Sequence, residues 1–356
     1  MTLTCPPTTA ARTGLLSLKF NQDQSCLTMA TATGFRVWNA DPFTLRYERD
    51  LGGGIGLATV LFRSNIVALV GGGPNPRFRN DRVMLWDDCR NQSIAELCFN
   101  STVRGVEMVR DAIAIALDER VYIYTLANLD LVKRVPTVDN PRGLVDIRAS
   151  EGGTDNVIAT LSTKAGYVEV HHSDNRMPLA RLSLNADGSL LATASEKARA
   201  SIGVGVYGTV IRVWHTASGE KRAELRRGKD AASINNLVFS LDSRWLAVSS
   251  DRGTVHIFDL DTPPTEAPSG LLQYIGSTGV LGAGVSEYST GWFSKAKIHL
   301  PDGAPTCVCA FGRTAGQVFV VDAEGIYGVY AFDVDKGGEA RVADRFLFGS
   351  EDREEA

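Results

Sequence analysis

The sequence predicts an all-β protein whose 356 residues form one domain, a seven-bladed β-propeller that spans residues 1–356. Two observations carry this prediction. Short β-rich runs bounded by Gly, Asn, Asp and Pro recur along the whole chain, whereas helical periodicity is nearly absent. An apolar run also marks each of seven successive units, and these runs begin at Leu27, Ile66, Ile113, Val157, Leu190, Leu246 and Val318.

The second strand of several units ends in an aromatic residue. Five such segments are Phe35–Trp38, Val83–Asp87, Val121–Tyr124, Val210–Trp214 and Val255–Asp259. They resemble the aromatic end of a WD-type propeller strand, where a ring fills the gap between neighbouring blades. The first units also repeat at close to the ~40–45 residues that a four-stranded blade occupies. Each unit is therefore expected to form one blade.

The fourth and fifth units depart from this repeat, and we expect irregular blades there. In the fourth unit the chain passes from Gly166–His172 almost directly into Leu179–Leu184, which predicts that the outer strand near residues 173–178 is missing. The fifth unit carries the extra segment Ala198–Tyr207 inside a hairpin. Genuine irregularities and artefacts of gene prediction would both produce this pattern.

The sixth unit contains a long excursion, Asp259–Ser289, that is rich in Gly, Pro and Ser. A loop of this length in a compact domain is usually functional or disordered. Its apolar residues are accompanied by no Lys or Arg, which suits a tip that enters the lipid interface as well as a plain disordered loop. Both interpretations stay open at this point.

Composition limits the classes of partner. The net charge is -4, so no overall basic field attracts nucleic acid, and anion binding must come from a local cluster. Six cysteines without a C-x-x-C pair, and an N-terminus without a basic segment followed by an apolar one, predict a cytoplasmic protein with reduced thiols. Cys307 and Cys309 are expected to be apolar fillers on one strand face rather than metal ligands. Membrane contact is expected to be peripheral, because no apolar stretch approaches ~20 residues.

Enzyme motifs lack their structural context. Gly203–Gly208 is formally G-x-G-x-x-G, but a strand follows it, and Gly71–Gly73 is followed by Pro74. A nucleotide loop needs a helix N-terminus to hold the phosphate. No cluster of Ser, His and Asp or of metal ligands emerges, so we expect a protein that is not an enzyme and has no catalytic residue, metal or cofactor.

The densest basic cluster, Lys221–Lys229, contains the adjacent pair Arg226 and Arg227 on an expected outer strand. Neighbouring strand residues point to opposite faces of a sheet, so each arginine should enter a different groove between blades. A charge run of this kind is also compatible with a solvated surface.

Each groove has candidate partners for an anion. Arginine binds phosphate bidentately, and hydroxyl groups or a protonatable imidazole beside it add hydrogen bonds. The candidates on one side are Ser195, Thr209 and Arg212, and those on the other side are Ser249, Ser250, Thr254 and His256.

The segment Glu224–Gly228, followed by Leu246–Phe258, resembles the PROPPIN family, propellers that bind polyphosphoinositides through a Phe- or Leu-Arg-Arg-Gly signature. The Leu form of the signature resembles the subgroup with shorter loops. Further matches cover nearly the whole chain and are Phe20–Ser25, Leu61–Asn65, Ala68–Pro76, Trp86–Asp88, Ala192–Lys197 and Trp292–Ser294.

The resemblance implies two sites for phosphatidylinositol 3-phosphate and the 3,5-bisphosphate, and a role as a recruitment scaffold in autophagy or endolysosomal traffic. It implies a protein that lies peripherally on vacuolar, endosomal and preautophagosomal membranes. The residues implied for the first site are Ser195, Thr209, Arg212, Arg226 and Lys164, and those for the second are Ser249, Ser250, Thr254, His256 and Arg227.

The resemblance also implies a protein partner, an elongated autophagic lipid-transfer protein bound by the outer surface of the second and third blades. Asn21 and Asp23 match the partner-binding motif. A generic propeller scaffold that binds proteins without lipid is the alternative, because fold alone does not fix function.

Departures from the family pattern favour the second lipid site over the first. The family's Ala-His before the first site has no counterpart here, and the insert separates Ser195 from Thr209. Ring closure further predicts a monomer in which the segment Thr13–Phe20 packs beside Val318–Phe332, because closing the ring removes exposed strand edges.

Overall fold

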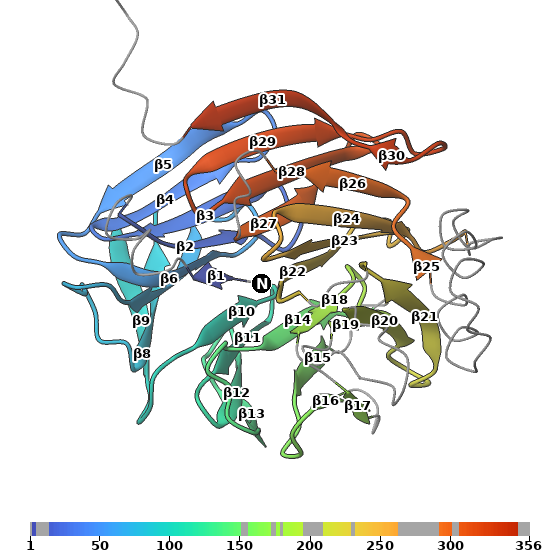
Figure 1. Cartoon of the computed structure of the whole chain (residues 1–356). Coiled ribbons are helices and arrows are strands. Elements are labelled where there is room, and N and C mark those ends of the chain that lie inside the picture. The colour runs from blue at the N-terminus through green and yellow to red at the C-terminus, as the bar shows by residue number, and fades with distance from the viewer. Residues whose placement is uncertain are drawn as a thin grey trace, which may run out of the picture.

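The strands form seven sheets arranged around a central axis, as the sequence predicted (Figure 1). The computed structural model describes residues 2–4, 14–150, 156–171, 176–178, 181–194, 209–228, 232–262, 292–300 and 306–347. The sixth-unit excursion from 263 to 291 and the fifth-unit insert lie outside the described residues. Within the described residues no helix is long and apolar enough to cross a membrane.

Blades 1 to 4 follow one another along the chain, each counted from its inner to its outer strand. Blade 1 contains β1 (Leu3–Thr4), β2 (Leu15–Phe20), β3 (Cys26–Thr31), β4 (Gly34–Asn39) and β5 (Thr44–Asp50), and blade 2 contains β6 (Ile55–Val60), β7 (Ile66–Gly71), β8 (Arg82–Asp87) and β9 (Gln92–Cys98). Blade 3 contains β10 (Gly105–Met108), β11 (Ala112–Ala116), β12 (Arg120–Thr125) and β13 (Leu131–Pro136), and blade 4 contains β14 (Val145–Ala149), β15 (Asn156–Leu161), β16 (Tyr167–Val170) and β17 (Arg176–Pro178).

Blades 5 to 7 complete the ring. Blade 5 contains β18 (Arg181–Leu184), β19 (Leu190–Ala194), β20 (Val210–His215), β21 (Lys221–Arg226) and β25 (Trp292–Phe293). Blade 6 contains β22 (Ile234–Phe239), β23 (Trp245–Ser250), β24 (Thr254–Asp259), β26 (Ala296–His299) and β30 (Gly338–Glu339), and blade 7 contains β27 (Cys307–Phe311), β28 (Gln317–Asp322), β29 (Ile326–Ala331) and β31 (Arg341–Leu347).

The antiparallel order within each blade gives the propeller two distinct faces. Segments such as 51–54, 99–104 and 137–144 link the outer strand of one blade to the inner strand of the next, and we call this end the connection face. The turn between the second and third strand of a blade lies on the same face. The first turn of each blade, such as 21–25, lies on the opposite face.

The ring closes by packing between blades 1 and 7. Leu18 and Leu27 share one buried cluster with Val321 and Tyr327, and the Tyr327 hydroxyl donates a hydrogen bond to the Ala40 carbonyl at 2.6 Å. The predicted contact between the N-terminal segment and residues 318–332 is confirmed for the part of that segment that the structure describes, which starts at residue 14.

The fourth blade corrects the prediction of a missing outer strand. The chain forms β17, in which Pro178 pairs with Tyr167 and Arg176 pairs with Glu169 of β16. This strand is three residues long, so the outer strand is shortened rather than absent. A short turn suffices because an antiparallel hairpin needs few connecting residues.

Blades 5 and 6 each carry an additional parallel strand at the outer edge. β25 pairs with β21, with Phe293 opposite Arg226, and β30 pairs with β26. These pairings cover outer edges that would otherwise expose unpaired backbone groups. The chain that returns from the long excursion therefore lies directly beside the end of the strand that carries Arg226.

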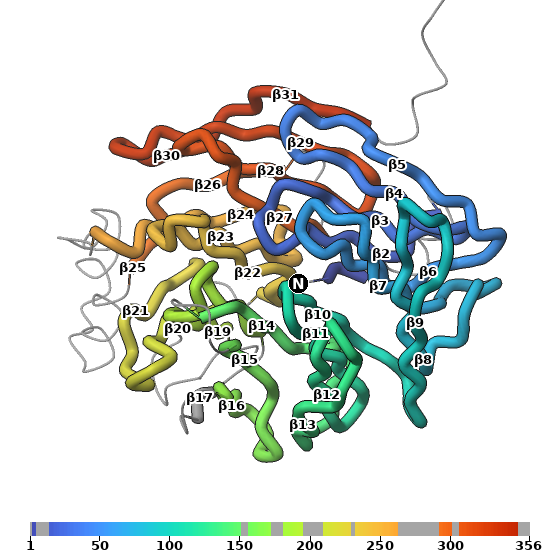
Figure 2. Tube along the Cα trace, turned by 180° about the vertical axis from the view of Figure 1, so that it is seen from behind, coloured from blue at the N-terminus to red at the C-terminus, as the bar shows by residue number. Residues whose placement is uncertain are grey.

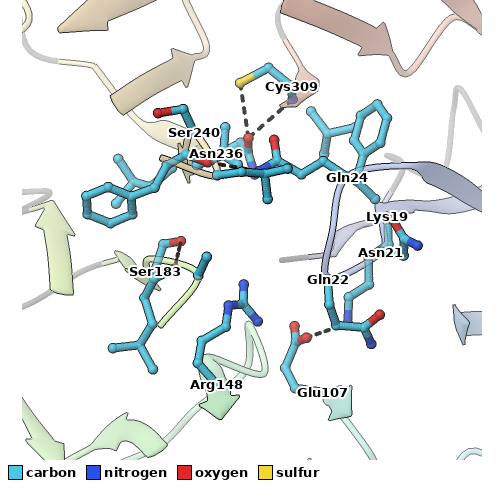
Figure 3. Close-up of a pocket in the computed structure, with 18 residues that line it drawn as sticks. Lys19, Asn21, Gln22, Gln24, Glu107, Arg148, Ser183, Asn236, Ser240 and Cys309 are labelled. Atoms are coloured by element: carbon cyan, nitrogen blue, oxygen red, sulfur yellow. Dashed lines mark hydrogen bonds and ion pairs between the residues drawn. The ribbon is translucent and has the colours of Figure 1, made fainter. Parts of the chain in front are cut away.

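The axis of the propeller is occupied by charged and amide side chains. β1 pairs with β2 and lies near the centre of the ring in both views (Figures 1 and 2). On the opposite face Gln24, labelled in Figure 3, donates to the Phe239 carbonyl at 2.9 Å and accepts from the Phe311 amide at 2.6 Å. It therefore joins blades 6 and 7. Lys19 forms a buried ion pair with Glu107 at 2.9 Å (Figure 3).

Candidate anion-binding grooves of blades 5 and 6

The end of β21 places Arg226 and Arg227 on opposite faces of blade 5. Leu225 belongs to the buried cluster shared with blade 6, so Arg226, the next residue on the strand, faces blade 4. Arg227 follows the strand, is 7% exposed, and donates its backbone N–H to the Thr209 carbonyl at 3.3 Å. The alternation that the sequence predicted is therefore present in the structure.

The groove on the blade 4 side, here the first groove, gathers cations around one carboxylate. Arg212 lies opposite Glu224 across the β20–β21 ladder. The Glu224 carboxylate lies 3.3 Å from Arg212, 3.4 Å from Arg226 and 3.2 Å from Lys221. Burial raises the pKa of Glu224, but these three cations outweigh it and hold the pKa below its usual value.

Glu224 is the residue of the first groove that sequence reasoning missed. It directly precedes the Leu-Arg-Arg-Gly signature, and its spacing two residues before Arg226 places both on the same strand face. An ionised carboxylate between the two arginines means that an incoming phosphate must compete with an internal counter-ion.

The other predicted residues of the first groove that the structure describes, Thr209 and Lys164, make contacts outside this cluster. Thr209 is buried, and its hydroxyl accepts from the Ala232 amide at 2.9 Å and donates to the Ala232 carbonyl at 3.0 Å. It thus anchors the segment that follows Arg227. Lys164 is exposed in the turn between β15 and β16, on the connection face, with its ammonium 4.8 Å from the Tyr167 ring. Ser195 lies outside the described residues.

The groove on the blade 6 side, here the second groove, is built around His256. Burial, followed by the charges of Arg227, Lys297 and His299, lowers the pKa of His256 to about 3. The imidazole is therefore neutral near pH 7, and its Nδ1 lies 3.1 Å from the Ser294 hydroxyl. Lys297 pairs with His256 across the ladder.

Three residues of the second groove were not predicted from the sequence: Ser294, Lys297 and His299. They follow the long excursion, and His299 pairs with Thr254 just as Lys297 pairs with His256. Paired residues on neighbouring strands point to the same face. The Trp292–Ser294 match points to this segment, but it does not give the register with which the returning strand pairs with β24.

The two adjacent serines of β23, Ser249 and Ser250, point to opposite faces of blade 6. The Ser249 hydroxyl donates to the Cys307 carbonyl of blade 7 at 2.9 Å, so Ser249 faces away from Arg227. Ser250 is fully buried, and its hydroxyl accepts from the Arg252 amide at 3.4 Å. Thr254 is half-buried at the start of β24, and its hydroxyl donates to the Arg252 carbonyl at 3.3 Å. Ser250, Thr254 and His256 therefore lie on the face of blade 6 that is turned toward Arg227, whereas Ser249 lies on the face turned toward blade 7.

Asn21 and Asp23 form hydrogen bonds within the first turn of blade 1. The Asn21 side chain donates to the Phe62 carbonyl at 3.0 Å and accepts from the Cys26 amide at 3.0 Å. Asp23 accepts from the Ser25 hydroxyl at 2.6 Å. The same N-x-D-x-S pattern at Asn185–Ser189 makes equivalent bonds in blade 5, so these side chains have a structural task in both turns.

The cysteine prediction holds, since Cys307 and Cys309 are both buried in one apolar cluster on β27. Among the described residues no group of three or more His, Cys, Asp and Glu side chains has the geometry of a metal site. The grooves hold guanidinium, ammonium and imidazole groups, which suit an anion with several acceptor oxygens.

The fold is a β-propeller that carries basic side chains on opposite faces of one blade. The PROPPIN family profile matches residues 14–345. Autophagy-related protein 18 of Dictyostelium discoideum is 32% identical over 362 residues, covering 94% of this chain and 93% of the relative. This chain therefore belongs to the PROPPIN family, a family of binding propellers and not of enzymes.

Solved structures show the same fold. Hsv2p of Kluyveromyces lactis has a TM-score of 0.70 at 20% identity and covers 94% of this chain and 99% of its own. KlAtg21, solved in complex with the coiled coil of AgAtg16, has a TM-score of 0.67 at 21% identity, covering 93% of this chain and 98% of its own.

Proposed function

We propose that this protein binds the headgroups of phosphatidylinositol 3-phosphate and phosphatidylinositol 3,5-bisphosphate through its two grooves. The observation that carries the proposal is the placement of Arg226 and Arg227 on opposite faces of one strand end, each among further cations. The protein would act from the cytoplasm as a monomeric recruitment scaffold on autophagic, vacuolar and endosomal membranes.

The second groove suits a phosphomonoester. A phosphate beside Arg227 and Lys297 receives charge-assisted hydrogen bonds, each worth about 1.5–3 kcal/mol. The same negative charge raises the pKa of the neighbouring His256 from its depressed value and recruits a further donor. A bound phosphate therefore increases the fraction of His256 that is protonated, and the protonated imidazole is a further donor to the ligand.

The first groove is proposed as the weaker site. Its phosphate must displace the contacts of Glu224 with Arg212 and Arg226 before it can use those arginines. The membrane itself would lie against the edge formed by blades 5 and 6. There β25 brings the end of the long apolar excursion beside Arg226, which supports insertion of that excursion into the lipid interface.

The direct test replaces both arginines with threonine, Arg226→Thr with Arg227→Thr. Loss of several charge-assisted contacts should reduce affinity for phosphatidylinositol 3-phosphate liposomes by more than about 100-fold, since ~1.4 kcal/mol corresponds to a factor of ten. Flotation measures binding, and circular dichroism confirms the β fold. Arg345→Ala, which removes an exposed arginine from blade 7, is the matched control. Wild-type binding by the double variant would reject the lipid-binding proposal.

A second function, binding of a protein partner, is supported by the outer surface of blades 2 and 3. Three apolar side chains are exposed there: Ile94 (45%) on β9, and Leu131 (39%) and Val132 (62%) on β13. Because the structural relative KlAtg21 was solved with a coiled coil, we propose that this surface recruits a protein, with an elongated autophagic lipid-transfer protein as the expected partner. Asn21 and Asp23 would contribute through the shape of their turn.

The partner proposal is tested with Ile94→Asp and Val132→Asp combined. The variant should lose co-purification with the lipid-transfer protein while keeping full liposome binding, because neither residue touches the grooves. Retained co-purification would show that the partner binds elsewhere.

A further inference from the structure

The connection-face end of the central channel contains a cavity that neither lipid groove uses. Its volume is about 330 Å³, within the range of small-molecule sites. The charged residues that line it are Arg104, Glu107, Arg142 and Arg181. Three of these are arginines, and they come from three consecutive blades.

The three arginines occupy equivalent places in the repeat. Arg104 precedes the inner strand β10 of blade 3, Arg142 lies in the segment that enters β14 of blade 4, and Arg181 is the first residue of β18 in blade 5. Because inner strands converge on the axis, residues at their starts meet at the mouth of the channel. The repeat itself therefore concentrates three guanidinium groups on one small cavity.

Two glycines allow a close backbone approach of the segments that carry the first two arginines. A Cβ on Gly105 would meet the Gly143 carbonyl oxygen at 2.3 Å, and a Cβ on Gly143 would meet the Arg104 carbonyl oxygen at 2.1 Å. Gly143 also has a φ of +62°, which favours glycine. Blades 3 and 4 can approach this closely only because both positions lack a side chain, and each glycine directly follows an arginine that lines the cavity.

The charge around the cavity is positive overall. Glu107 is the one carboxylate among the described lining residues, and Lys19 matches it at 2.9 Å. Arg104 contacts Asp118 at 2.7 Å, but both side chains are at least one third exposed, so a ligand replaces this pair at low cost. Arg181 donates its Nε–H to the Ile234 carbonyl at 2.8 Å, which fixes the guanidinium at the channel wall.

We infer that this cavity binds a small soluble molecule that carries two or more phosphate groups, held by Arg104, Arg142 and Arg181. Guanidinium groups bind phosphate bidentately, and the hydroxyls of Thr2, Thr4 and Thr306 add donors around the cavity. Several phosphates on one molecule match several arginines spaced around a ring. The inference does not depend on lipid binding, since the cavity lies on the axis and the grooves lie between outer strands.

The test is carried out in the Arg226→Thr, Arg227→Thr background, which removes the proposed lipid grooves. Isothermal titration with pyrophosphate and with inositol hexakisphosphate should show binding in this background. Adding Arg142→Ala should weaken it at least about tenfold, and adding Arg181→Ala as well should abolish it. Adding Arg345→Ala, which removes an exposed arginine from β31, should leave it unchanged. Binding that survives loss of both Arg142 and Arg181, or that is absent in the groove-deleted background, would overturn the inference.

Two further measurements separate the channel from the membrane and from misfolding. With intact grooves, Arg142→Ala and Arg181→Ala combined should bind phosphatidylinositol 3-phosphate liposomes like the wild type, and a matching loss of liposome binding would overturn a separate channel site. Since Arg181 also bonds to the backbone of blade 6, the exposed Arg142→Ala variant alone carries the conclusion if the combined variant has a lower thermal midpoint.

Discussion

The two faces of blade 5 receive the same side chain, an arginine, and surround it differently. Arg226 meets Glu224 at 3.4 Å, an acceptor from its own strand. Arg227 meets a neutral imidazole whose pKa is lowered to about 3 by burial and by surrounding cations. The positive charge of the first groove is thus partly neutralised by the Glu224 carboxylate. In the second groove, burial and nearby cations keep His256 uncharged, and a bound anion would favour its protonation. A carboxylate on the arginines' own strand sets the surroundings of Arg226, whereas the neighbouring blade 6 sets those of Arg227.

Replacing each arginine separately tests whether the two grooves contribute unequally to lipid affinity. Arg227→Thr should reduce affinity for phosphatidylinositol 3-phosphate liposomes about 100-fold, through the loss of two charge-assisted contacts. Arg226→Thr should reduce it about tenfold, because that arginine already contacts Glu224. Liposome flotation over a lipid titration gives both values. Equal losses would show that the two grooves are equivalent.

Replacing residues 263 to 289 of the excursion with a Gly/Ser linker, which leaves β24 and the buried Leu260 intact, tests whether membrane insertion serves both grooves. Burying about 100 Å² of apolar surface contributes about 2.5 kcal/mol, so liposome affinity should fall tens of fold. Binding of a soluble inositol 1,3-bisphosphate headgroup should stay unchanged, because the described groove residues remain. An unaltered liposome affinity would show that the excursion does not contribute to membrane binding.

The pH dependence of binding tests the second groove alone. A bound phosphate raises the pKa of His256 above about 3, so the complex holds more protons than the free protein. Affinity should therefore rise as pH falls from 7.5 to 5.5, up to about tenfold relative to His256→Gln. Calorimetry of both proteins isolates the effect, because protonation of the phosphate itself affects both equally. Parallel pH profiles would remove His256 from the site.

The smallest expected effect is an increase in the lipid affinity of the first groove. Glu224→Gln removes the internal counter-ion, and a partly exposed charge of this kind is worth about 0.5–1 kcal/mol. Affinity of the Arg227→Thr protein for liposomes should then rise about two- to fivefold. Lys221 loses a partner in the same variant, so Lys221→Gln in the Arg227→Thr background serves as the control. No gain would mean that Glu224 does not limit the first groove.

Repeated motifs show what a sequence pattern can and cannot separate. Asn21–Ser25 matched a partner-binding motif, yet the turn at Asn185–Ser189 has the same pattern and equivalent hydrogen bonds. A motif that stabilises a turn recurs wherever the turn recurs, so the match alone did not identify a binding surface. The same limit applies to Thr209, whose hydroxyl bonds to the backbone of Ala232.

The sequence by itself determined the seven units, the buried strand faces and the opposite orientation of Arg226 and Arg227, because strand alternation is a local property of the backbone. Tertiary structure alone decided which groups share a groove. The turning of Ser249 toward blade 7 and the pairing of Lys297 with His256 depend on which blade lies next and on the register of a strand that returns after a long excursion. Register across such a distance is fixed by packing of the whole ring, and no local pattern of residues encodes it.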